Sequence, residues 1–291
     1  MILVTGANGK TGRAVINSLL PKGEAIRALV HRSEQIPQLQ TLGVSDVIAG
    51  EMGDVDVIKK TLDGVRAVYF ICPAMHPEEA AIGNEMINAS REVGLEHFVY
   101  HSVLHPQLSK LPHHHEKLKV EEILIESGLN YTIMHPGMYM QNILDLWKRI
   151  EQQKVYAVPF GTSTLLSMVD LEDVAEAASI VLTGNGHYAS SYDLCGPEAL
   201  SAVKIAEVLG IQLGSTIKAE SIPIDIWEQH ARGFGLGDYQ VSTLSAMFRH
   251  YAQYGFQGNP NVLSWLLGRP TTSFAAFIER TIMLQTASDG Q

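Results

Sequence analysis

Short apolar runs alternate with amphipathic stretches through the first half of the chain. The runs are rich in β-branched residues, and the intervening stretches repeat apolar residues at helical spacing. This alternation predicts parallel strands joined by crossover helices, in a sheet covered on both faces. The predicted strands are 2–4, 25–30, 46–49, 67–71, 97–101 and 131–135, and the predicted helices are 13–20, 35–42, 55–62, 79–93 and 116–127.

The pattern is less regular after Pro136. Helices are predicted over 140–151, 171–182 and 201–209, short strands near Val155, Ser167 and Tyr192, and a largely helical segment from 223 to 284. We therefore predict an α/β fold, a doubly wound parallel sheet of Rossmann type with a smaller, mostly helical C-terminal lobe. The NAD(P)-binding domain is expected over 1–155, with some strands and helices contributed by 165–195. The interleaved smaller lobe is expected over 156–291.

A glycine-rich turn follows the first apolar run directly. The segment from Thr5 reads T-G-A-N-G-K-T-G, and a helix-like stretch begins at Arg13. The first glycine permits a tight turn, the second lets the backbone approach a pyrophosphate, and the third lets helix and strand pack closely. An ordinary tight turn, the alternative, explains three glycines less well. The segment predicts a dinucleotide site made by Gly6, Asn8, Gly9, Lys10, Thr11 and Gly12.

The end of the second predicted strand bears on which dinucleotide binds. A carboxylate there would meet the ribose hydroxyls of NAD, but the chain has His31 and Arg32, and the first acid is Glu34. The planar, permanently charged guanidinium of Arg32 suits a 2′-phosphate. We therefore expect NADP(H), with NAD(H) as the alternative if Arg32 is merely solvated.

Composition limits the class of partner. The 291 residues carry 21 basic and 31 acidic side chains, a formal charge of −10. Without a long basic run, nucleic acid is not an expected partner. The chain shows neither a signal-peptide pattern nor an apolar stretch long enough for a membrane span, so we expect a cytoplasmic protein with no membrane partner. Cys72 and Cys195 lie in apolar segments, as expected for buried thiols.

Candidate chemistry lies at later strand ends, where ligands collect in open parallel sheets. The fourth strand ends in Cys72-Pro73 and the fifth in His101-Ser102. His113 and Lys117 are one helical turn apart and can point the same way. The three consecutive histidines from His113 rarely converge on one ion, so no metal site is expected. The pair Glu121-Glu122 is interpreted as a solvated helix face.

Together these segments resemble the NmrA-like family of the atypical short-chain dehydrogenase/reductase superfamily. The similarity covers nearly the whole chain. It rests on T-G-A-N-G-K-T-G at 5–12, I-R-A-L-V-H-R at 26–32, Gly50-Glu51, L-D-G-V-R-A-V-Y-F at 62–70, S-G-L-N-Y-T-I-M-H-P-G-M-Y-M-Q-N at 127–142, S-M-V-D-L-E-D-V-A at 167–175 and Y-D-L-C-G-P-E-A-L at 192–200.

The resemblance implies a Rossmann domain, an NADP(H) preference and a small C-terminal lobe. Typical superfamily members use a Ser, a Tyr and a Lys four residues after the Tyr. Lys117 matches that Lys, Ser102 lies near the expected Ser, and the Tyr position is His113. Family members include NADPH-dependent reductases of quinones, dyes or phenolic compounds, and nucleotide-sensing regulators. Because the tyrosine position holds His113, these residues do not favour a tyrosine-dependent mechanism.

Other residues leave the proton donor open. The imidazole of His113 can pass a proton near neutral pH, although a solvated loop position before the helix is the alternative. Tyr139 is the best alternative phenol, or else an aromatic packed between lobes. Lys117 is expected to orient the nicotinamide ribose. Further cofactor contacts are expected from His31, Arg32, Glu51, Cys72, Pro73 and Lys117.

The predicted function is an NADP(H)-binding reductase that transfers hydride to a small apolar, aromatic acceptor, quinone-like or dye-like. Methionine and aromatic residues in the second half, such as Met138, Met140 and Trp227, favour a flat apolar substrate. The first alternative is a non-catalytic NADP(H) sensor that regulates a protein partner. A nucleotide-sugar epimerase is less favoured, because the Tyr is missing.

Overall fold

The main feature of the computed structural model, which describes residues 1–289, is a seven-stranded sheet. Its strand order is β10-β6-β5-β4-β1-β2-β3, and the pairs from β3 to β6 are all parallel. The strands are β1 (Ile2–Val4), β2 (Ile26–Val30), β3 (Asp46–Ala49), β4 (Ala67–Phe70), β5 (His97–His101), β6 (Tyr131–Pro136) and β10 (Ser190–Leu194). The order reverses between β1 and β4, which is where doubly wound sheets bind their ligands.

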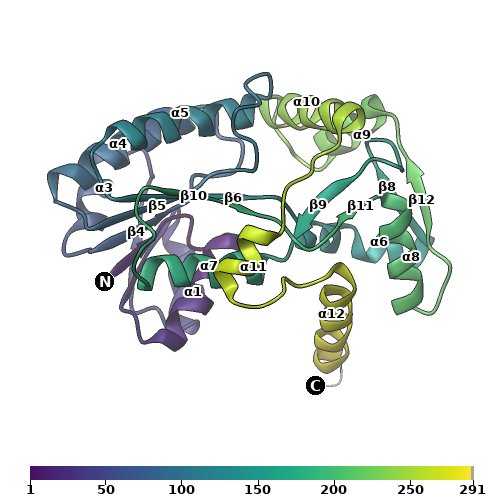
Figure 1. Ribbon diagram of the computed structural model, residues 1–291, viewed down its shortest axis with the longest axis horizontal. Coiled ribbons are helices and arrows are strands. Elements are labelled where there is room, and N and C mark those ends of the chain that lie inside the picture. The colour runs from purple at the N-terminus through teal and green to yellow at the C-terminus, as the bar shows by residue number, and fades with distance from the viewer. Residues whose placement is uncertain (290–291) are drawn as a thin grey trace. The chain divides into compact units, whose positions relative to one another are not determined.

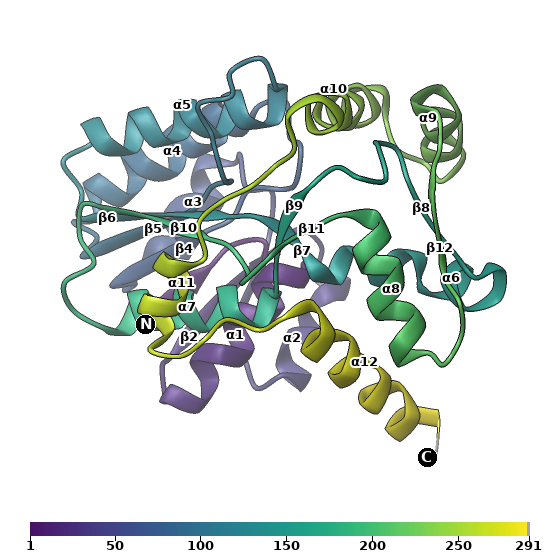
Figure 2. The same ribbon diagram turned by 45° about the vertical axis from the view of Figure 1, so that its right-hand side comes forward.

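Helices cover both faces of this sheet (Figures 1 and 2). Helices α3, α4 and α5 lie on one face, and α1 and α7 lie on the other. The helices and short 3₁₀ turns are α1 (Lys10–Leu19), η1 (Leu20–Lys22), η2 (Ser33–Gln35), α2 (Ile36–Thr41), α3 (Val55–Leu62), α4 (Glu79–Glu92), α5 (Pro112–Glu126) and α7 (Leu171–Thr183). The predicted fold class, a doubly wound α/β sheet, is confirmed.

The core under α4 and α5 shows which residues at the strand ends point toward these helices. Phe70, Phe98 and Tyr100 are fully buried and pack with Val120 and Leu124 of α5. Because side chains alternate along a strand, residues two positions beyond Tyr100 and Ile133 point to the same helical face. Those residues are Ser102 and His135, and both face α5.

The chain divides into two compact units. The first holds Met1–Pro136 and Glu172–Asp193, and the second holds Gly137–Leu171 and Leu194–Gln291. In the second, a three-stranded sheet has the order β11-β9-β7 and a two-stranded sheet pairs β12 with β8. Its elements are β7 (Met138–Tyr139), η3 (Met140–Leu146), α6 (Trp147–Gln153), β8 (Val155–Val158), β9 (Leu166–Val169), β11 (Ala199–Leu200), α8 (Ala202–Gln212), β12 (Lys218–Ser221), α9 (Ile224–Gly233), α10 (Asp238–Tyr254), α11 (Asn261–Leu267) and α12 (Phe274–Asp289).

Several helix boundaries differ from the sequence prediction, among them the start of α1 at Lys10 and the end of α8 at Gln212. The helix expected from Glu116 begins at Pro112, because proline at the first helical position lacks only an N–H that the helix does not use. The helix expected over 140–151 is instead a 3₁₀ segment followed by α6. The Gln141 side chain anchors that segment by donating to Asp170 and accepting from the Leu171 backbone.

The described helices differ in length or hydropathy from a membrane-spanning segment. Within residues 1–289, none combines the length and the apolar character that crossing a bilayer requires. Both cysteines are buried, as predicted.

Candidate active site

The glycine turn between β1 and α1 has the backbone geometry that the sequence predicts. Gly6 adopts φ +55°, a conformation that strains residues with a Cβ. A Cβ on Gly12 would lie only 2.4 Å from the Gly6 carbonyl oxygen, so α1 can pack here only on a glycine. Gly9 precedes the helix and is exposed. Within the described part of the chain, no side chain caps α1 and no acid lies in its first turn, so its N–H groups suit an anion.

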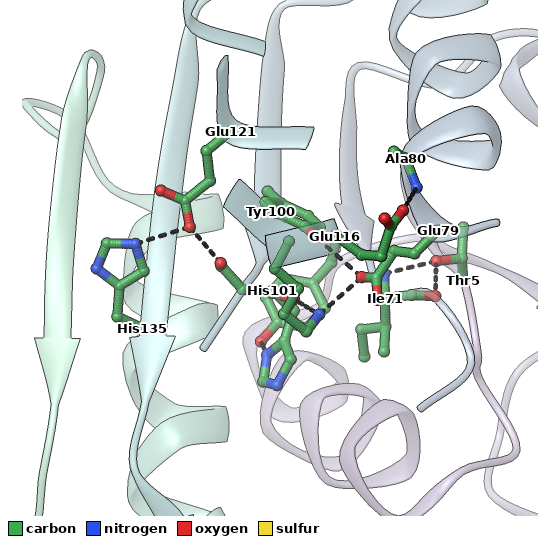
Figure 3. Close-up of polar contacts among 12 residues, drawn as sticks. Thr5, Ile71, Glu79, Ala80, Tyr100, His101, Glu116, Glu121 and His135 are labelled. Atoms are coloured by element: carbon green, nitrogen blue, oxygen red, sulfur yellow. Dashed lines mark hydrogen bonds and ion pairs between the residues drawn. The ribbon is translucent and has the colours of Figure 1, made fainter. Parts of the chain in front are cut away.

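Side chains around the turn hold it in place. Arg13 donates to the Asn8 amide oxygen at 3.0 Å. Thr5 Oγ1 donates to the Ile71 carbonyl at 2.9 Å and accepts from the Ile71 N–H at 2.7 Å. The second pair joins the ends of β1 and β4 at the point where strand order reverses (Figure 3). These bonds therefore hold the end of β1 against the end of β4, directly beside the turn.

The predicted ribose-binding residues follow β2 and β3, which are neighbours in the sheet. His31 Nδ1 lies 3.3 Å from Glu51 Oε1, and both side chains are exposed. The Arg32 backbone N–H donates to the side-chain oxygen of Gln35, the last residue of η2, and the Arg32 side chain is exposed. A guanidinium in this position is available to a phosphate, whereas the Glu51 carboxylate contacts the His31 imidazole.

Lys117 lies at the centre of a buried polar cluster. Its Nζ donates to Glu79 Oε1 at 2.8 Å and to the His101 carbonyl at 2.9 Å. Tyr100 donates its hydroxyl to the same Glu79 oxygen at 2.9 Å (Figure 3). Glu79 is the first residue of α4, so the cluster joins α4, α5 and β5. An ammonium has three donors, and these two bonds use two of them.

Cys72 and Pro73 directly follow β4. Cys72 is buried, and burial, followed by the Glu79 charge, raises the pKa of its thiol. The thiol therefore stays protonated at neutral pH, and it is suited to packing against a ligand instead of acting as a nucleophile. Pro73 is exposed.

His113 differs from both sequence interpretations. It lies in the first turn of α5, so it is not a solvated loop residue. Its Nδ1 is buried and has no hydrogen-bond partner among the described residues. Burial, followed by the Lys117 charge, holds its pKa well below the ordinary value. At neutral pH the ring is uncharged, so the expectation that His113 passes a proton near neutral pH is not supported.

Glu121 corrects a second prediction, since it is buried at 6% exposure instead of lying on a solvated helix face. The physical reason is its position in the helix: Lys117, Glu121 and Leu124 share the stripe of α5 that faces the sheet. Its Oε1 accepts a short hydrogen bond from Ser102 Oγ and lies 3.0 Å from His135 Nε2 (Figure 3). Its neighbour Glu122 is exposed, as predicted.

His135 completes this second polar cluster. Its Nδ1 lies 3.1 Å from Asp193 Oδ1 on β10, the neighbour of β6. Burial alone would lower the pKa of His135, but hydrogen bonds to Asp193 and Glu121 outweigh it and raise the pKa to about 9. The same contact holds the pKa of Asp193 below its ordinary value. His135 is therefore a cation at neutral pH.

Tyr139 lies on β7, in the second unit, and is half-buried. All other predicted site residues belong to the first unit. The role of Tyr139 as an alternative phenol stays a prediction.

The sequence interpretation missed Glu79, Tyr100 and His135, and it misjudged Glu121. A signal existed for two of them. Glu121 follows Lys117 at helical spacing, and His135 ends a predicted strand, beside the ends that had been considered. Glu79 carries no such pattern, because its burial depends on how α4 packs on α5.

The chain is similar along almost its whole length to proteins of known activity. The chain is 26% identical over 282 residues to the NAD(P)H azoreductase of Xenophilus azovorans, covering 95% of this chain and 96% of that protein. It is 28% identical over 277 residues to quinone oxidoreductase 2 of Escherichia coli (strain K12), covering 94% and 96%. The crystal structure of the NADPH-dependent quinone oxidoreductase of Escherichia coli complexed with NADPH shares 26% identity, with a TM-score of 0.85 and coverage of 97% and 100%. The model of the NmrA-like family matches residues 1–284, and the chain belongs to this family.

Proposed function

We propose that this protein is an NADP(H)-dependent reductase that transfers hydride to a small aromatic acceptor of the quinone or azo-dye type. The observation that carries the proposal is the glycine turn at the start of α1, in a chain that aligns almost end to end with two reductases. The name of the first relative specifies azo reduction with NAD(P)H, and that of the second specifies a quinone as substrate. The combination supports a redox role more directly than it supports a binding role alone.

The residues that would hold the cofactor fit its shape and charge. The N-terminal end of α1 suits the pyrophosphate, because no acid lies in its first turn and Gly9 leaves the backbone exposed there. The exposed guanidinium of Arg32 suits a 2′-phosphate. Lys117 retains one ammonium donor for a ribose hydroxyl, while Glu79 and the His101 carbonyl fix the direction of its side chain.

The bound NADPH would supply a hydride, and the chain would position the acceptor. A quinone suits this site, because its reduced product is a stabilised anion that needs little enzymic protonation. Neutral His113 would contact the acceptor through hydrogen bonding or packing, without supplying a proton. Catalysis at this site would thus depend mainly on how the residues position the acceptor relative to the cofactor.

A stopped-flow experiment tests the proposal. Protein loaded with NADPH is mixed with menadione, with methyl red and with malachite green, and the loss of NADPH absorbance is recorded. We expect turnover of about one per second or more with at least one acceptor, and strong loss on Lys117→Ala. Gly9→Val should abolish cofactor binding, whereas Gly233→Ala, where nothing lies within 4 Å of the added Cβ, serves as the matched glycine control.

The contrary result would be NADPH binding without turnover above roughly 0.01 per second for any acceptor. That outcome would favour a nucleotide sensor that acts through a protein partner. Unchanged NADPH affinity in a folded Gly9→Val variant would remove the dinucleotide assignment itself.

A further inference from the structure

We propose that Ser102, Glu121, His135 and Asp193 form a relay that carries protons from solvent to an acceptor bound at the carboxyl end of β5. The inference rests on the proposed reductase function. It deepens that function, because it identifies a proton source for acceptors whose reduced form must be protonated.

The relay is continuous in space. Ser102 is the first residue after β5, and its hydroxyl donates to Glu121 Oε1. The same oxygen lies 3.0 Å from His135 Nε2, and His135 Nδ1 lies 3.1 Å from Asp193 Oδ1. Four side chains, one directly after β5 and the others on α5, β6 and β10, thus form one unbroken path of hydrogen bonds.

Exposure increases toward one end of the path. The side chains of Glu121 and His135 are 8% and 11% exposed, whereas that of Asp193 is 41% exposed. Asp193 can therefore exchange protons with water, while the other end lies at the strand edge where ligands bind. This gradient of exposure is what a path that leads protons from solvent to a buried site requires.

The charges also suit proton transfer. His135 lies between the carboxylates of α5 and β10, and the nearby imidazole of His105 also acts on Asp193. A protonated His135 between two carboxylates holds an exchangeable proton at neutral pH. An ion pair that served only to join α5 to the sheet would not require a path that continues to Ser102.

Other side chains at this edge are poorer proton sources. His113 is uncharged at neutral pH, and burial raises the pKa of the Cys72 thiol. The Tyr100 hydroxyl donates to Glu79, and burial also raises its pKa. A proton source apart from these three side chains therefore has a chemical role.

The proposed step balances as follows. Hydride addition to one nitrogen of an azo bond breaks the N=N π bond and leaves a lone pair and negative charge on the other nitrogen. That nitrogen takes the Ser102 hydroxyl proton as the hydroxyl turns toward it from Glu121. His135 gives its proton to the Glu121 carboxylate, and Glu121 passes it on to Ser102. His135 then takes a proton from water through the Asp193 carboxylate, which leaves a hydroxide ion in the solvent. The products are a hydrazine and the oxidised cofactor, and all four side chains return to their initial states.

The test compares an acceptor that needs a proton with one that does not. Methyl red and menadione are reduced by the wild-type protein and by His135→Gln, Asp193→Asn and Ser102→Ala. We expect the methyl red rate to fall at least tenfold more than the menadione rate in each variant. The matched control is His97→Gln, which alters another buried histidine, bonded to Thr132 at the opposite end of the sheet, and should leave the ratio of the two rates unchanged.

Two further readouts separate a relay from a structural tie. The wild-type methyl red rate should fall above pH 9 as His135 loses its proton, and the break should move to lower pH in Asp193→Asn. Histidine NMR of the protein without acceptor should show the same displacement of the His135 titration, independently of turnover. The methyl red rate should also show a larger solvent deuterium isotope effect than the menadione rate.

The outcomes are distinguishable. If the wild-type protein reduces none of menadione, methyl red and malachite green, the proposed function fails and the relay fails with it. If it reduces both menadione and methyl red and the rate ratio is unchanged in folded Asp193→Asn and Ser102→Ala, the relay alone is overturned. Reduction of menadione with no azo reduction at any pH also overturns it.

Discussion

The Lys117 ammonium and the Glu79 carboxylate form an ion pair at 2.8 Å with side chains only 6% and 1% exposed. Because burial removes both charges from most contact with solvent, each depends on the other. Tyr100 contributes a second contact to Glu79 by donating its hydroxyl to the same carboxylate oxygen. The pair therefore fixes α4, α5 and the end of β5 together at the edge where the cofactor is proposed to bind.

Glu79→Gln is expected to lower the free energy of unfolding by about 3–5 kcal/mol, because it leaves Lys117 buried and unpaired. Urea denaturation measures the change. Glu78→Gln is the matched control, since Glu78 is the exposed neighbour. The double variant Glu79→Gln/Lys117→Met should recover part of the loss, because both charges are then removed. If Glu79→Gln and Glu78→Gln have equal free energies of unfolding, the inferred coupling between Glu79 and Lys117 is contradicted.

Gly12→Ala should destabilise the turn, since its Cβ would lie 2.4 Å from the Gly6 carbonyl oxygen and 2.7 Å from the Ala7 Cα. Both neighbours are backbone, so relief requires α1 to shift. We expect a loss of about 1–3 kcal/mol and weaker NADPH binding. Thermal unfolding and a fluorescence titration with NADPH test this. A variant with unchanged stability and affinity would show that the contact is easily relieved.

Arg32→Ala should lower NADPH affinity roughly tenfold or more and leave NADH affinity almost unchanged, because a charge-assisted hydrogen bond contributes about 1.5–3 kcal/mol. Calorimetry with both cofactors measures the effect. Arg91→Ala removes the same exposed charge from the last turn of α4 and is the control. Equal losses for both cofactors would mean that Arg32 is structural. No loss for either would make Lys10 or His31 the next candidate.

Stability should depend on His135 at alkaline pH. Its pKa is about 9 in the folded protein against 6.5 ordinarily, so the folded state binds its proton more tightly. That contribution is complete below pH 6.5 and is lost as pH rises through 9. Between pH 7 and 10 the wild-type free energy of unfolding should fall by about 2 kcal/mol more than that of His135→Gln, allowing for the partial exposure of Asp193. Parallel curves for the two proteins would contradict the shifted pKa.

The sequence predicted the sheet well because its strands are short, apolar and separated by amphipathic helices. The glycine turn was also predictable, since steric requirements at Gly6 and Gly12 are local. The start of α5 was placed late because Pro112 was not taken as a first helical residue, although proline favours that position.

Side chains that depend on packing between elements were harder to predict. Glu121 and Glu122 are adjacent acids in the sequence, yet one is buried and the other exposed. Only the rotation of α5 against β5 and β6 distinguishes them. Glu79 and Asp193 likewise acquire their partners from segments far away in the chain, and no local pattern identifies those partners.

The chain order of the first unit has a consequence for synthesis on the ribosome. Six strands of the main sheet are complete at Pro136, but α7 and β10 come from residues made after an excursion of 35 residues into the second unit, Gly137–Leu171. A nascent chain that has folded its first 136 residues exposes β6 as a temporary edge strand, and His135 then lacks Asp193. The arrival of β10 covers that edge and adds the second carboxylate in the same event. The covering of the β6 edge and the final proton affinity of His135 are therefore established together, late in the folding of this unit.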